Sequence, residues 1–115
     1  MDLDSFTGGY NRAYAVVNIE AVRRNILKSR EFLPENTGII AVIKTDAYGH
    51  GAAKVADAVK DITAGFAVAT IDEAVELREA GITSHIIVLG YISPREYAAA
   101  IEHDIILSMF DYKQA

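Results

Sequence analysis

The chain has 115 residues, a net charge of −5 and a hydrophobic content of 51%. This length allows one domain at most, and the composition is sufficient for a hydrophobic core. Acidic and basic residues are interspersed, so no basic face is available for nucleic acid. The absence of cysteine excludes disulfides and thiolate metal sites. The three histidines, His50, His85 and His103, are too widely spaced to predict a metal centre.

Nothing in the sequence indicates a membrane protein. No apolar run approaches the roughly 18 residues that a spanning helix needs, and the first ten residues are acidic and polar, unlike a secretion signal. We therefore expect a cytoplasmic protein. Residues 1–12 have no hydrophobic periodicity, and we interpret them as a flexible arm before a domain at 13–115.

The first predicted elements are a short strand at residues 14–17 and a helix after Asn18. Asn18 is a suitable N-cap, and apolar residues follow at helical spacing from Ile19 to Leu33. Pro34 is expected to end this helix.

The most informative stretch comes next. Residues 39–43 are five apolar residues, mostly β-branched, and a glycine-containing segment follows them. This pattern predicts a strand buried on both faces, as in parallel sheets covered by helices. Lys44 comes directly after this strand, at the carboxyl edge where such sheets carry their chemistry.

The remaining sequence alternates helices and strands. Two S/T-x-x-E segments, Thr70–Glu73 and Ser93–Glu96, are predicted capping boxes, and Gly81 suits a helix C-terminus. The predicted helices are 52–62, 70–81 and 95–102, and the predicted strands are 66–69, 85–89 and 105–110. Strand ends near 44, 70, 90 and 110 indicate repeated βα units with parallel, right-handed connections. An open doubly wound sheet and a (β/α)8 barrel both fit this order.

Lys44 has two interpretations. It could be a surface lysine whose stem packs on the strand while its ammonium reaches water. It could instead be an amine removed from water and nucleophilic toward a carbonyl. The residue pattern alone leaves both open.

The segment Ala41–Gly51, AVIKTDAYGHG, closely resembles the pyridoxal phosphate lysine motif of bacterial alanine racemases. Residues 66–82 and 86–90 resemble the strands and helix that follow in that family, in the same order. The resemblance implies a (β/α)8 barrel. A closed barrel takes about 250 residues, so we expect the N-terminal half of a barrel, truncated from a longer protein. The family's second, β domain is not expected in these residues.

The resemblance also implies a function: interconversion of L-alanine and D-alanine, which supplies D-alanine for peptidoglycan. Lys44 would carry pyridoxal 5'-phosphate covalently and exchange a proton on one face of the substrate. In the family, a tyrosine from the partner subunit of a homodimer serves the other face. That tyrosine has no counterpart here, so we expect the chain alone to be inactive.

Three further residues are implied at the cofactor. The Tyr48 hydroxyl would bond the cofactor phosphate, and Val42 and Leu89 would form apolar walls. Tyr48 could equally be a half-buried aromatic at the barrel mouth. Val42 and Leu89 could simply pack in the hydrophobic core of the barrel. Thr45 stands where alanine is common in the family.

Other functions of the same fold group stay open. A serine racemase is one, and a basic amino acid decarboxylase is another, although the YGHG sequence at residues 48–51 argues against it. Two further alternatives are not enzymes. One is a barrel that binds pyridoxal phosphate without turnover, and the other is an inert half-barrel that only associates with its missing half.

Overall fold

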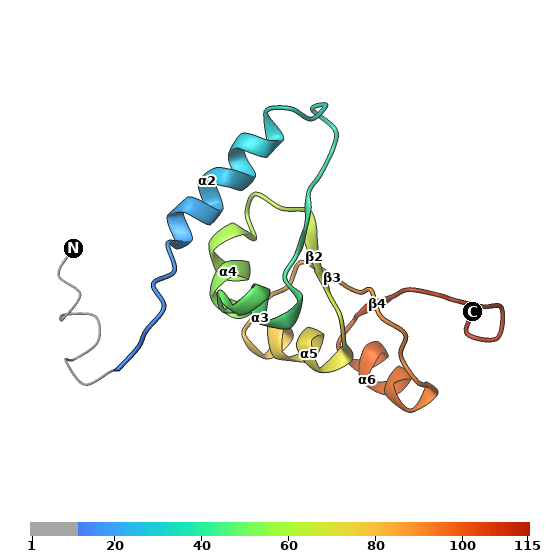
Figure 1. Ribbon diagram of the computed structural model, residues 1–115. Coiled ribbons are helices and arrows are strands. Elements are labelled where there is room, and N and C mark those ends of the chain that lie inside the picture. Colours follow the sequence, from blue (N-terminus) through green and yellow to red (C-terminus); the bar gives the residue numbers. More distant parts are fainter. Residues whose placement is uncertain (1–11) are drawn as a thin grey trace.

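The computed structural model describes residues 12–115, and these form a parallel sheet covered by helices on one face (Figure 1). The strands lie in the order β1-β2-β3-β4. Their bounds are β1 (Ile40–Val42), β2 (Gly65–Val68), β3 (His85–Val88) and β4 (Ile106–Leu107). The helices are α2 (Ile19–Arg30), α3 (Lys44–Gly49), α4 (Ala52–Val59), α5 (Ile71–Glu79), the 3-10 helix η1 (Pro94–Glu96) and α6 (Tyr97–Glu102). The predicted order of parallel βα units is therefore confirmed.

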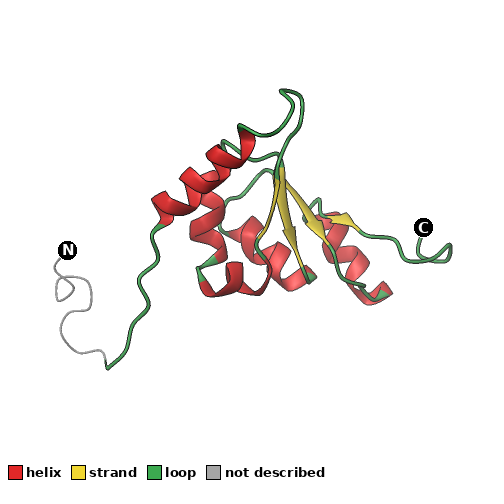
Figure 2. Ribbon diagram, turned by 45° about the horizontal axis from the view of Figure 1, so that its top comes forward, coloured by secondary structure: helices red, strands yellow, loops and turns green. Residues whose placement is uncertain are grey.

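One face of the sheet packs against the helices and forms the core. Every pair of neighbouring strands is parallel, and the register places Ala41, Phe66 and Ile86 in one row. Phe66 and Ile86 are fully buried, as are Val68 and Val88 in the next row on this face. Figure 2 shows the helices α4, α5 and α6 gathered on one side of the strands. This two-layer packing leaves the carboxyl ends of the strands at a common edge.

The other face, here called the inner face, is open in the part of the chain that the structure describes. It carries Ile40, Val42 and Ile106, which are 47%, 43% and 44% exposed. The prediction that the strand before Lys44 is buried on both faces was therefore wrong. The reason is that no described element covers the inner side of β1.

Several predicted boundaries differ from the structure. Residues 14–17 form no strand, since an isolated extended segment has no ladder partner among the described residues. Helix α2 ends at Arg30, four residues before Pro34, and α4 ends at Val59 rather than at residue 62. Strand β4 covers only two residues of the predicted 105–110. Of the predicted arm at residues 1–12, all but Arg12 lies outside the described residues.

The predicted helix ends are largely confirmed. The Asn18 side chain accepts a hydrogen bond from the Ala21 amide at 3.0 Å. Thr70 and Glu73 form the predicted capping box at the start of α5. Gly81 has a φ of +88° just after the same helix, a conformation that glycine adopts without strain.

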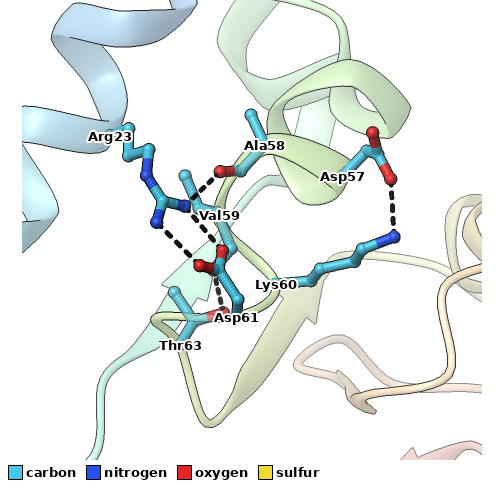
Figure 3. A network of polar contacts seen from close by, with 7 residues as sticks. All are labelled: Arg23, Asp57, Ala58, Val59, Lys60, Asp61 and Thr63. Carbon is cyan, nitrogen blue, oxygen red and sulfur yellow. Dashed lines mark hydrogen bonds and ion pairs between the residues drawn. The ribbon is translucent and has the colours of Figure 1, made fainter.

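Arg23 links α2 to the C-terminal end of α4 and to the residues just after it (Figure 3). The guanidinium donates to both carboxylate oxygens of Asp61, at 2.6 and 2.7 Å, and to the Ala58 carbonyl at 2.7 Å. The hydrogen bond from Arg23 lowers the pKa of Asp61, and the same bond raises the pKa of Arg23. Among the helices that the structure describes, none has the length and apolar character that a membrane crossing requires.

Candidate active site

Lys44 lies where β1 ends and the chain turns. The Ile43 amide still donates to the Ala67 carbonyl at 2.9 Å, so the β1–β2 ladder continues up to the residue before the lysine. Lys44 then begins α3 and is half-buried. The predicted place of this lysine, at the carboxyl edge of the sheet, is confirmed.

The segment after Lys44 is a left-handed turn that the sequence did not indicate. Thr45, Asp46, Ala47 and Tyr48 all have φ between 53° and 55°, and none of them is glycine. This conformation costs roughly 1–2 kcal/mol per residue for L-amino acids. Such backbone strain persists only where the surroundings hold it, and it concentrates at functional sites.

Local contacts hold the far end of the turn. The Asp46 carboxylate accepts from the Ala52 amide at 2.8 Å, which satisfies one of the free amides at the start of α4. The Asp46 carbonyl accepts from the Gly51 amide at 2.9 Å. The Ala47 side chain is buried in the core, and its carbonyl lies 2.9 Å from Nδ1 of His50. The turn is therefore anchored to α4 as well as to β1.

Glu73 holds the near end of the turn from the next βα unit. One carboxylate oxygen accepts from the Thr45 amide at 2.7 Å. The other accepts from the Ala69 amide at 2.6 Å and from the Thr70 amide at 3.3 Å. A single carboxylate thus connects the ends of β1 and β2.

The other predicted site residues lie at different distances from the lysine. Val42 is two residues before Lys44 on the inner face of β1. If the parallel register is extended by two residues past Val42 and Ile87, Lys44, Ala69 and Leu89 fall in one row. Lys44 and Leu89 thus follow two strands, β1 and β3, that lie on either side of β2. Leu89 is 44% exposed at this edge.

Tyr48 and Val42 also meet at an apolar cavity of about 320 Å³ between α2, β1 and α4. Tyr48 itself is 60% exposed, so it is not the half-buried aromatic considered from the sequence. Lys44 and Leu89 do not line this cavity. The structure therefore brings Val42 and Tyr48 together in one cavity and places Lys44 and Leu89 along the edge beside it.

Comparison with known proteins decides the family. A family model described as alanine racemase, N-terminal domain, matches residues 17–115. The chain belongs to this family. An alanine racemase of Streptococcus equi subsp. zooepidemicus is 43% identical over 95 residues, which cover 83% of the chain and 26% of that protein.

Solved structures of the family share the fold of this chain. The alanine racemase of E. faecalis superposes with a TM-score of 0.82 at 36% identity, over 84% of this chain and 26% of that one. The alanine racemase of Bacillus anthracis, with bound L-Ala-P, gives a TM-score of 0.80 at 41% identity, over 84% and 25% of the two chains. The chain thus spans about a quarter of the length of the relatives that it matches. The fold is that of the N-terminal part of the alanine racemase barrel.

Sequence reasoning missed two residues at this edge. Glu73 was predicted only as part of a capping box, and Asp46 was given no role. No local pattern indicates the contact of Glu73, which reaches 28 residues back along the chain to Thr45, whereas Asp46 accepts from the Ala52 amide only six residues away. The predicted parallel order of β1 and β2 is the sequence-level feature that places Glu73 near Thr45.

Proposed function

We propose that the protein carrying this chain is a pyridoxal phosphate-dependent alanine racemase, and that Lys44 carries the cofactor. The observation that supports this most is the lysine at the carboxyl end of β1, followed at once by a strained left-handed turn, in a chain of the alanine racemase family. The homodimer, the cytoplasmic location and the alanine substrate implied by the family motif belong to the same proposal.

The described residues fit the proposed cofactor. The ion pairs among residues 12–115 are Arg23–Asp61 and Lys60–Asp57, so the Lys44 amine is not neutralised by a carboxylate there. A Lys44 amine that no described carboxylate binds is available to form the covalent link to the aldehyde of the cofactor. The exposed Tyr48 follows the lysine by four residues, on the same turn, and a phenol hydroxyl donates well to a phosphate oxygen.

Each residue has a distinct part in the proposed reaction. When bound, pyridoxal phosphate withdraws electrons and makes the Cα–H bond of an amino acid acidic. Lys44 would hold the cofactor covalently and, once released, would take up or return the proton at Cα on one face. Tyr48 would orient the cofactor through its phosphate, and Val42 and Leu89 would exclude water from that face.

Reductive trapping tests the role of Lys44 directly. The chain would be incubated with pyridoxal phosphate and reduced with borohydride, and the modified lysines would be mapped by peptide mass spectrometry. We expect Lys44 to be modified at least about tenfold more than the exposed Lys54 and Lys60, which act as internal controls. Equal modification of all three would refute a specific cofactor lysine.

A chimera tests turnover. The chain would replace the matching quarter of the B. anthracis alanine racemase, and conversion of L-alanine to D-alanine would be measured, with L-serine as the alternative substrate. Loss of general acid–base catalysis typically costs 10²–10⁴-fold, so we expect Lys44→Ala to lower kcat by at least about a hundredfold. Lys54→Ala is the matched control. An active Lys44→Ala chimera would contradict the proposal.

A further inference from the structure

The Glu73 carboxylate makes its shortest contacts outside its own helix. In a capping box, the glutamate reaches back to the amide of the N-cap residue, which here is Thr70 at 3.3 Å. The bonds to the Ala69 and Thr45 amides are much shorter, at 2.6 and 2.7 Å. The carboxylate is therefore directed at the edge of the sheet more than at the start of α5.

These two short bonds involve different oxygens and different strands. One oxygen binds the amide that follows β1, and the other binds the amide that follows β2. Hydrogen bonds to an ionised carboxylate are roughly twice as strong as neutral ones. Glu73 thus joins the amides of Thr45 and Ala69 and fixes the ends of the two strands relative to each other beside Lys44.

The bond to Thr45 falls on the first residue of the left-handed turn. On its other side, Lys44 follows Ile43, whose amide is fixed in the ladder to β2. The backbone of Lys44 is therefore held from both directions, by the sheet before it and by Glu73 after it. Reactive groups need such support, because displacement by about 1 Å is enough to cost much of the rate.

We propose that Glu73 is a positioning residue, which fixes the left-handed turn so that the Lys44 amine projects from a constant point at the sheet edge. The proposal extends the function assigned to Lys44 and rests on it for its chemical consequence. The turn itself, however, can be monitored without any cofactor.

Two matched variants separate this role from helix capping. Glu73→Gln replaces one carboxylate oxygen with an NH2 group, so the side chain satisfies the amide after β1 or the one after β2, but not both. Thr70→Ala removes the other half of the same capping box, where the Thr70 hydroxyl accepts from the Glu73 amide, and leaves the contact to Thr45 in place.

The first readout is amide hydrogen exchange of the 115-residue chain, measured at Thr45 by NMR. We expect Glu73→Gln to speed exchange at Thr45 about tenfold relative to an amide in β3, whereas Thr70→Ala changes it less than about twofold. Equal effects of the two variants, or no effect of Glu73→Gln, would overturn the proposal. If Glu73→Gln does not fold, Glu73→Asp takes its place, because it keeps the charge on a shorter side chain. We expect it too to speed amide exchange at Thr45 more than Thr70→Ala does.

The second readout is the trapping ratio of Lys44 to Lys60 with pyridoxal phosphate. We expect this ratio to fall about tenfold in Glu73→Gln and to stay near the wild-type value in Thr70→Ala. A wild-type chain without preference for Lys44 would count against the proposed function, while the exchange data would still decide whether Glu73 holds the turn. A preference for Lys44 that persists in Glu73→Gln would overturn the positioning role alone.

Discussion

Arg78 joins the two loops that lead into β3 and β4. Its guanidinium donates to the carbonyl oxygens of Ile82 and Ser84, both at 2.7 Å. It also donates to the carbonyls of His103 at 2.8 Å and Asp104 at 2.9 Å. No other side chain of the described residues donates to as many backbone carbonyl oxygens. The start of both strands therefore depends on one side chain of α5.

Replacing Arg78 by methionine keeps the apolar stem and removes every donor. The bonds to Ile82, Ser84 and His103 are partly buried, and each is worth about 1 kcal/mol. The Asp104 carbonyl is exposed, so water replaces the guanidinium there at little cost. We expect Arg78→Met to lower the free energy of unfolding by about 3 kcal/mol, a large part of the 5–15 kcal/mol typical of a domain.

Urea denaturation followed by circular dichroism measures this loss. With an m-value of about 2 kcal/mol/M, the midpoint should fall by about 1.5 M while the slope stays unchanged. Arg24→Met, at an exposed position on α2, is the matched control and should change the midpoint little. The reasoning fails if the two variants lose similar amounts of stability.

Four further changes test other features. Gly65→Ala should lower stability by about 1–3 kcal/mol, because an added Cβ would lie 2.7 Å from a β3 carbonyl oxygen; an unchanged Tm would contradict this. Thr45→Gly should raise the free energy of unfolding by about 1 kcal/mol in urea titrations, because its φ is +54°; a loss of stability would count against the strained turn. Since Arg23 lowers the pKa of Asp61 from its ordinary value of 3.8, their ion pair stabilises the fold above that value and loses this effect as the pH falls through the lowered pKa. The stability difference between wild type and Asp61→Asn should therefore be present at neutral pH and be lost as the pH falls through the lowered pKa of Asp61, and a difference independent of pH would refute the assignment. The open inner face and strand edges should make the chain self-associate, and Ile106→Lys should reduce this in sedimentation velocity; a wild-type chain that stays monomeric at all concentrations would contradict the prediction.

The sequence predicted what depends on neighbours along the chain. Asn18, the Thr70–Glu73 pair and Gly81 act over three or four residues, and each lies where its local pattern indicated. The alternation of strands and helices is equally local, since it follows from hydrophobic periodicity. The position of Lys44 at the carboxyl edge of the sheet follows directly from that alternation.

The predictions from sequence failed where residues distant along the chain determine the local structure. A left-handed turn through four non-glycine residues contradicts local preference, and it is held by Glu73 and by the start of α4. The burial of residues 39–43 was predicted from composition, but burial depends on what lies beside a strand. The strand predicted at residues 14–17 is absent for the same reason, because a strand forms only beside another strand with which it can pair.

Helix α2 stands apart from the other helices in how it is held. It has no fully buried side chain. It contacts the rest of the chain through Ile19, Val22 and Ile26 at the margin of the core and through the bonds of Arg23 to Asp61. Elements with so little buried apolar surface open before the rest of a domain. Release of α2 would uncover the apolar cavity beside β1 while the sheet stays intact. The Arg23–Asp61 pair at the surface contributes to holding this helix, so protonation of Asp61 in acid would loosen α2 slightly while Ile19, Val22 and Ile26 still pack on the core.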